Sequence, residues 1–329
     1  MIIRLFKDSH PASYVIVPVF ILAFLAVSWQ GPGDYVVQNP MPLYDLVLGL
    51  VLSLPEWITG LIVYIILLSQ VFHLNSLIGK HEVFYKNSFL PALFFMMFLV
   101  MIPQFMTFHP VLIINSILLF ILDKLFKIYK NPSPLTMAFD ACFLIGLATL
   151  IYLPAISFFL LFVFSILILK TFSWRDWMVG LTGFLLPFFF AFVYYFWVDG
   201  LDEMKEKFFL NDITRIWDTS GLALQGYSIA MVVVLVILGL TLLRIRQNFY
   251  KNVSRIRNFQ QVIFMFLIVA IISLAFTGSV AVYRFSILTI PISTLISYYF
   301  LAGKKAWWNE LLFWTLMSVL VLNHLNIMK

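Results

Sequence analysis

Apolar runs close to twenty residues long recur from one end of the chain to the other, and no other feature constrains the fold as strongly. About 20 consecutive apolar residues are what an α-helix needs to cross the hydrocarbon core of a bilayer. The composition agrees, because 63% of the residues are hydrophobic and 11% are charged, whereas globular chains carry about 25% charged residues. These features exclude a water-soluble enzyme, a disulfide scaffold and a disordered tail. We predict an all-α, polytopic transmembrane helical bundle that forms a single integral membrane domain over residues 1–329.

A hydropathy window of about 19 residues divides the chain into about eleven spans. The predicted spans lie at 11–29, 57–73, 89–107, 111–128, 135–152, 154–172, 177–198, 225–243, 259–277, 283–301 and 308–325. Residues 135–169 contain no evident loop, so they form either one long tilted helix or a hairpin. A single helix of that length would extend about 52 Å, well beyond a hydrocarbon core of roughly 30 Å. We therefore expect a tight turn at Tyr152, Leu153 and Pro154.

Lysine and arginine occur in alternate loops, as the positive-inside rule requires of a polytopic membrane protein. Sixteen of the 21 basic residues fall on one side of the predicted topology: Arg4, Lys7, Lys80, Lys86, Lys124, Lys127, Lys130, Lys170, Arg175, Arg244, Arg246, Lys251, Arg255, Arg257, Lys304 and Lys305. On the other side, Lys205, Lys207 and Arg215 share their loop with several Asp and Glu residues. We therefore predict a cytoplasmic N-terminus and a periplasmic C-terminus. The net charge of +6 follows from this sidedness and does not imply binding to nucleic acid.

One predicted cytoplasmic loop, residues 244–258, carries a dense basic cluster. Its members are Arg244, Arg246, Lys251, Arg255 and Arg257. Clusters of this kind next to a membrane helix lie along anionic lipid headgroups. The alternative is a docking surface for a cytoplasmic partner, and the sequence alone does not separate the two interpretations.

The segment after the first predicted span, residues 30–56, is neither a plain loop nor a span. Its first part, QGPGDYVVQNPMPLYD, is rich in Pro and Gly. Irregular backbone of this kind needs water or protein around it rather than lipid, so we expect it in the periplasm. Residues 43–54 either form a short helix in the outer membrane interface or belong to the following span.

Three acids and one arginine on the predicted external face are the candidate site residues: Asp34, Asp45, Glu56 and Arg284. Carboxylates grouped with an Arg can hold a divalent cation or a lipid phosphate, and a carboxylate can act as general base. A second external segment, residues 199–224, is an amphipathic loop that can lie in the interface or cover a lateral opening. The alternative is that these charges only solvate loop ends. Because the His residues show no ligand spacing, we expect no metal and no cofactor unless the carboxylates are catalytic and hold a divalent cation.

Several stretches carry a resemblance to a known family. In chain order they are IIRLFKDSHP, NPMPLYDL, FDACFLIGLATLIYLPA, FSWRDW, GFLLPF, IPISTLISYYF and KKAWWNELLF. Together they resemble a family of polytopic inner-membrane proteins of the Bacteroidota that has no established activity. The resemblance runs over most of the chain and implies a multi-pass protein of the bacterial inner (cytoplasmic) membrane, but it assigns no catalytic residue.

Two functions of different classes fit these features. The first, favoured by the lack of catalytic motifs, is a non-catalytic integral subunit or scaffold of a cell-envelope complex for export, lipoprotein handling or glycan assembly. The alternative is a polyprenyl-phosphate-dependent glycosyl or group transferase on the periplasmic face. In that case Asp34 is the base or metal ligand and Arg284 binds the donor phosphate, with Asp45 and Glu56 as lesser candidates. A transporter comes third, because no central carboxylate or His chain marks an ion path. The expected partners are the lipid bilayer, other membrane-protein subunits and, for the transferase, a polyprenyl-phosphate lipid.

Overall fold

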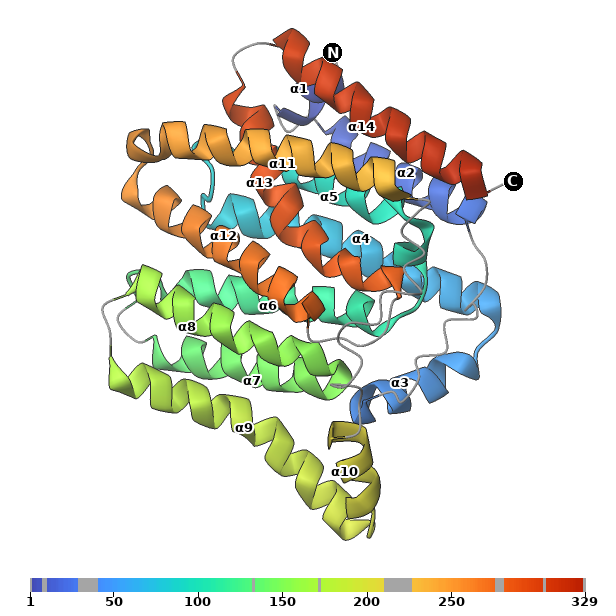
Figure 1. Cartoon of the computed structure of the whole chain (residues 1–329), viewed down its shortest axis with the longest axis vertical. Helices are drawn as coiled ribbons and strands as arrows, with labels where there is room; N and C mark the ends of the chain where they lie inside the picture. Colours follow the sequence, from blue (N-terminus) through green and yellow to red (C-terminus); the bar gives the residue numbers. More distant parts are fainter. Residues whose placement is uncertain are drawn as a thin grey trace.

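Helices provide all the regular structure in the parts of the chain that the structure describes. The computed structural model describes residues 2–7, 11–28, 41–131, 134–170, 173–209, 227–275, 281–303 and 306–327. Within these ranges there are α-helices and short 3-10 helices, here labelled η, and no strands (Figure 1). The predicted all-α class is therefore confirmed.

The helices follow one another with short connections. Their bounds are α1 (Ile2–Lys7), α2 (Ala12–Ser28), α3 (Pro42–Leu52), α4 (Glu56–Lys80), α5 (Leu90–Met101), η1 (Pro103–Met106), α6 (Pro110–Ile128), α7 (Leu135–Ile151), η2 (Leu153–Ser157), α8 (Phe158–Leu169), α9 (Trp174–Trp197), α10 (Leu201–Phe209), α11 (Ser228–Asn248), η5 (Phe249–Lys251), α12 (Ser254–Ala275), η6 (Val282–Leu288), α13 (Thr289–Ala302) and α14 (Ala306–Ile327). Five helical segments in the described ranges are long and apolar enough to cross a membrane: Glu56–Lys80, Trp174–Trp197, Ile229–Lys251, Ser254–Ala275 and Val282–Ala302. Shorter apolar helices cover four of the other predicted ranges, and α6 and α14 cover the remaining two.

Three predicted spans are each divided between an α-helix and a 3-10 helix, namely α5 with η1, η2 with α8, and η6 with α13. Proline explains the first break. Ile102, which precedes Pro103, has the extended backbone that the residue before a proline prefers, with φ −121° and ψ 113°. Hydropathy alone cannot locate such breaks, because both parts of each span are apolar.

The turn expected within residues 135–169 is confirmed. α7 ends at Ile151, and Tyr152 is extended, with φ −151° and ψ 107°. After the short η2, α8 runs back alongside α7 (Figure 1). The segment is therefore a hairpin and not one long helix. For residues 43–54 the sequence left open a short separate helix or a part of the following span. The structure has a separate helix, because α3 ends at Leu52 and α4 begins at Glu56.

The predicted basic loop at residues 244–258 is mostly helical, so its predicted bounds are too wide. Arg244 and Arg246 lie in the last turns of α11, and Arg255 and Arg257 lie in the first turn of α12. The sequence prediction ended the span where the charges began, but a helix continues past the apolar run. Long Arg side chains let it do so, because their charged ends reach the interface.

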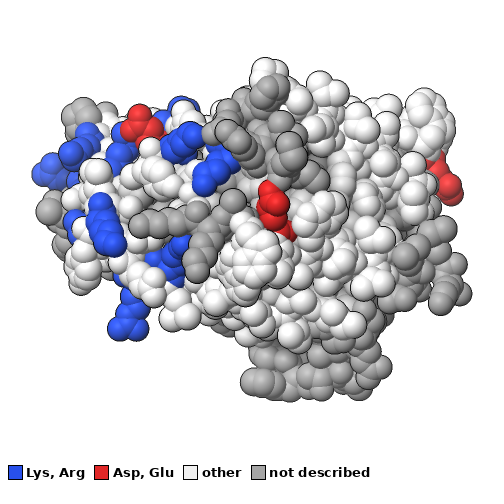
Figure 2. Space-filling model, turned by 90° about the horizontal axis from the view of Figure 1, so that it is seen from above, with Lys and Arg blue, Asp and Glu red and all other residues white. Residues whose placement is uncertain are grey.

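On the face seen in Figure 2, Lys and Arg side chains gather at one end of the molecule, and we call this the basic end. Contacts between distant segments join the helix ends there. Arg255 Nη1 is 2.9 Å from Glu82 Oε2, and the Tyr85 hydroxyl donates to the Leu301 carbonyl at 2.8 Å. The end at which α9 finishes and α10 begins is called the outer end.

Burial differs strongly between the central and the peripheral helices. Every residue of α5 is buried, and α5 packs against α2, α4, α13 and α14. By contrast, only 22% of the most apolar stretch of α9 is buried inside the protein, and the same holds for α11. These two helices therefore present apolar surface that a bilayer would cover.

Candidate functional site

The α7–α9 pair is packed at backbone contact between Phe139 and Gly146 of α7. A Cβ atom added to Gly183 of α9 would lie 2.6 Å from the Phe139 carbonyl oxygen. One added to Gly146 of α7 would lie 2.6 Å from the Phe184 carbonyl oxygen. Small residues allow this approach, as is typical of helix pairs in membranes. The two helices therefore cannot separate or slide here without losing close backbone packing.

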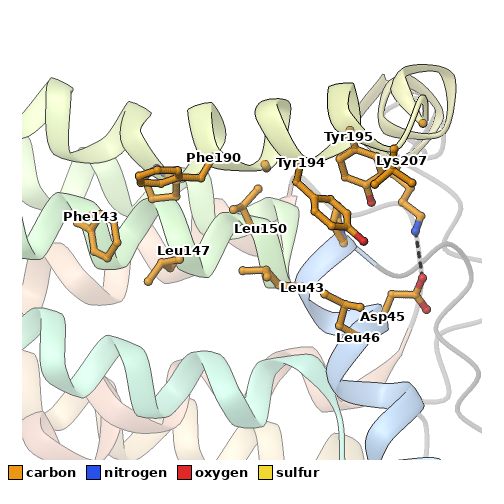
Figure 3. A pocket seen from close by; sticks show the side chains of 15 residues that line it. Leu43, Asp45, Leu46, Phe143, Leu147, Leu150, Phe190, Tyr194, Tyr195 and Lys207 are labelled. Carbon is orange, nitrogen blue, oxygen red and sulfur yellow. Dashed lines mark hydrogen bonds and ion pairs between the residues drawn. The ribbon is translucent and has the colours of Figure 1, made fainter.

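The second part of α9 diverges from α7 as it runs toward α10 (Figure 1), and α9 contains Pro187. A proline inside a helix removes one backbone hydrogen bond and favours such a bend. The divergence opens a cleft of about 420 Å³ between the two helices, with α3 and α10 closing its outer end. Leu147 and Leu150 of α7 and Phe190 of α9 give the cleft its apolar walls (Figure 3). Its volume is in the range of small-molecule sites, which span roughly 300–1,000 Å³.

An ion pair closes the outer end of this cleft. Lys207 Nζ of α10 lies 3.0 Å from Asp45 Oδ2 of α3, although the two residues are 162 positions apart (Figure 3). The Lys207 side chain is 15% exposed and that of Asp45 is 50% exposed. The pair is therefore asymmetric: the ammonium is largely removed from solvent, and the carboxylate is half hydrated.

Two tyrosines of α9 stand beside the ion pair. Tyr194 and Tyr195 line the cleft and lie at the same end as Asp45 and Lys207 (Figure 3). Tyr195 is buried, and Tyr194 is 56% exposed. The described mouth of the cleft thus offers a carboxylate, an ammonium and two phenol hydroxyls next to an apolar wall. Such a mouth suits a ligand with a polar head and a hydrocarbon chain.

The structure brings only part of the predicted constellation to this cleft. Asp45 lines it, and Lys207 from the segment 199–224 joins it through α10. Glu56 is exposed in the first turn of α4 and does not line the cleft. Arg284 lies in η6 and does not line the cleft. Asp34 lies outside the described residues.

A buried polar cluster on α6 and η6 was not predicted from the sequence. His109 is 1% exposed, and its Nδ1 accepts the Leu112 N–H at 2.9 Å, which caps α6. The His109 ring stacks on Tyr283, with 4.8 Å between ring centroids. Asn115 Nδ2 donates to the Ser286 carbonyl at 3.2 Å. These contacts provide hydrogen-bond partners for the first turn of α6 and for the backbone of η6. The cluster therefore stabilises the outer end and does not form an open site.

Intramolecular contacts occupy three of the five residues in the predicted basic cluster. The Arg244 guanidinium lies 4.8 Å from the Tyr299 ring centroid, and that of Arg257 lies 5.6 Å from the Phe249 centroid. Arg255 pairs with Glu82. The remaining two, Arg246 and Lys251, are exposed. The cluster therefore holds helix ends together and also presents charge at the surface.

Two further acids at the basic end are held by lysines. Lys124 Nζ is 2.6 Å from Asp140 Oδ2, which joins α6 to α7. Lys170 Nζ is 2.7 Å from Asp176 Oδ2, and Asp176 is 2% exposed. Sequence analysis missed the second pair because nothing in the spacing shows that Asp176 is buried.

In the described ranges no three His, Cys, Asp or Glu residues come together as ligands for a metal ion. No family model, no curated protein and no solved structure matches this chain. The cleft and its ion pair are therefore interpreted from their own geometry.

Proposed function

We propose that the protein is a multi-pass protein of the bacterial inner membrane with eleven spans, a cytoplasmic N-terminus and a periplasmic C-terminus. Three observations support this proposal. Each of the eleven predicted ranges holds an α-helix or an α-helix with a 3-10 segment. On the face seen in Figure 2 the Lys and Arg side chains gather at one end, whereas Lys205 and Lys207 lie on α10 at the outer end beside acidic residues. The positive-inside rule then assigns that end to the cytoplasm.

Within that membrane, we propose that the protein is an integral subunit of a cell-envelope complex and binds the hydrocarbon chain of a lipid-linked intermediate in the cleft. The apolar cleft at the outer end, closed by Asp45 and Lys207, carries this proposal. α9 lies at the edge of the bundle, and the Phe190 side chain on the cleft is itself 59% exposed (Figure 1). A chain from the surrounding bilayer can therefore enter without crossing the helical core.

Filling the cleft tests the proposal. In Leu150→Trp and Leu147→Trp, a larger side chain enters the space that the lipid chain would occupy. The matched control is Leu185→Trp, because Leu185 belongs to α9 but is 51% exposed and does not line the cleft. The measurement is native mass spectrometry of lipids that remain bound to the full chain after extraction in lipid nanodiscs.

We expect the wild type and Leu185→Trp to retain a lipid, and the two cleft variants to lose it while keeping their thermal unfolding temperature. Equal lipid retention in all four proteins would contradict the proposal. Co-purification from native membranes, followed by crosslinking, tests the subunit role separately, and a protein recovered only as a monomer would contradict that role.

The position of Asp45 favours a second candidate, the polyprenyl-phosphate-dependent transferase. A carboxylate at the mouth of a lipid cleft can accept a proton from an acceptor hydroxyl during group transfer. Asp45→Asn should then abolish the activity and leave the lipid bound, because the amide keeps the shape but not the basicity. Unchanged envelope composition in cells that carry Asp45→Asn as their sole copy would exclude this candidate.

A further inference from the structure

We propose that Lys207 binds the phosphate of the lipid and that Asp45 holds its place when no lipid is present. The ligand class is a lipid phosphate monoester, with its chain in the cleft and its head at the α3–α10 mouth. This inference rests on the proposed lipid-binding function and adds the group that recognises the head.

The exposure of the two partners indicates which of them needs the other. An ammonium that is largely out of water loses hydration and needs a charged partner. Lys207, at 15% exposure, is in this position, whereas Asp45, at 50%, keeps much of its hydration. Asp45 can therefore leave the pair at low cost, provided that another anion takes its place.

A phosphate monoester is a stronger partner for Lys207 than Asp45 is. It carries a charge of about −1.5 to −2 near neutral pH and has three strong acceptor oxygens, compared with one negative charge on a carboxylate. Because the phosphate has the larger charge and more acceptor oxygens, its charge-assisted hydrogen bonds to the ammonium are stronger than those of the carboxylate, and the exchange is favourable. The displaced Asp45 carboxylate would turn to solvent.

The surroundings of the ion pair select a lipid phosphate over a free phosphate. The residue next to Asp45, Leu46, lines the cleft and is 60% exposed. Apolar wall continues from there to Leu150 and Phe190 (Figure 3). A free phosphate would gain only polar contacts at the mouth, whereas a lipid also gains the burial of its chain.

Lys205 provides a matched control on the same helix. It lies 3.0 Å from Asp202, but the two side chains are 70% and 98% exposed, and both belong to α10. A pair this exposed contributes little and makes no contact with the cleft. Replacing Lys205 therefore changes the charge of α10 by the same amount without touching the proposed phosphate site.

The experiment compares two probes, undecaprenyl phosphate and undecaprenol, bound to the full chain in phosphatidylcholine nanodiscs and quantified by native mass spectrometry. Lys207→Gln should weaken the binding of undecaprenyl phosphate about tenfold, the loss expected for one charge-assisted hydrogen bond. Undecaprenol binding should stay the same. Lys205→Gln should change neither probe, Lys207→Arg should preserve the preference for phosphate, and Asp45→Asn should strengthen undecaprenyl phosphate binding by removing the competing carboxylate.

An unchanged ratio of the two probes in Lys207→Gln would overturn the inference, and so would an equal loss of both probes, because a merely structural role would produce it. Lys207→Arg keeps the charge, so loss of the phosphate preference in a folded Lys207→Arg protein would also count against it. Failure of the wild type to retain either probe would instead refute the proposed lipid-binding function. The two failures are therefore distinguishable.

Discussion

The two ends of the molecule are built from the same helices but are closed in different ways. At the basic end, α7 and α9 meet at backbone contact, and Asp176 is buried against Lys170. At the outer end the same two helices diverge, and in the pair that joins α3 to α10 at the mouth of the cleft the Asp45 carboxylate is half exposed. The comparison shows that one helix pair can provide both a fixed base and an open cleft.

This difference separates stability from function along α9. On α9, the close contacts with α7 lie from Gly183 to Pro187, whereas the side chains that line the cleft lie at Pro187 and beyond it. Substitutions at the basic end should therefore mainly change the free energy of unfolding. Those at the outer end should mainly change ligand retention.

The largest effect on stability is expected from Lys170→Met. This change leaves the Asp176 carboxylate buried without its cation, which costs about 3 kcal/mol of the free energy of unfolding. Chemical denaturation in detergent measures it. Lys205→Met is the outer-end control and should stay within about 0.5 kcal/mol, because its pair with Asp202 is exposed. Equal losses at both positions would remove the distinction between the two ends.

Gly183→Ala should have the next largest effect. Its new Cβ would lie 2.6 Å from the Phe139 carbonyl oxygen, so α9 must move away from α7. Overpacking of this kind costs about 1–3 kcal/mol. Gly239→Ala in α11 is the matched control, because a Cβ there meets nothing within 4 Å. A thermal unfolding temperature that falls in Gly239→Ala but not in Gly183→Ala would contradict the close packing of the pair.

A smaller, pH-dependent effect is expected at His81, the residue that caps α4 at the basic end. Burial lowers the pKa of the His81 imidazole, while its 2.8 Å hydrogen bond to Asp123 opposes the change and the charges of Lys80 and Lys127 add to it. The neutral ring is therefore the folded form. Below about pH 6.5 the unfolded chain binds more protons at this position than the folded chain does, so stability falls with acidification.

The measurement for His81 is the thermal unfolding temperature at about pH 7.5 and about pH 5.5, on either side of the ordinary histidine pKa. The wild type should lose more stability over this interval than His81→Gln, which cannot take up a proton there. A larger pH dependence in the variant would show that the sign is wrong.

Most of the fold was predictable because the bilayer limits the choices. Apolar run length located the helices, and the length limit on one span placed the turn at Tyr152 before Pro154. The breaks in the spans were not predicted, because α5 and η1 are both apolar. The basic segment was predicted as a loop, because charged residues lower the hydropathy of a window whether or not they are helical. Arg244 and Arg257 in fact belong to α11 and α12.

The site was predictable only in part. Asp45 was selected as an external acid, but its partner Lys207 is 162 residues away, and hydropathy carries no information on which distant helices meet. The cleft depends on where α9 leaves α7, and Pro187 indicates a bend without giving its direction. The rotation of each helix about its axis is set by packing against neighbours, so sequence alone could not place Asp45 and Lys207 together.

The opposite placement of the two ends is the central claim, and site-specific labelling tests it most directly. The sequence has a single cysteine, Cys142, which is 0% exposed and needs no replacement. New cysteines are placed at the exposed positions Lys86, at the basic end, and Asp202, at the outer end. A maleimide that cannot cross membranes should label Asp202→Cys in intact spheroplasts and Lys86→Cys only after permeabilisation. Labelling of both positions from the same side would contradict the account.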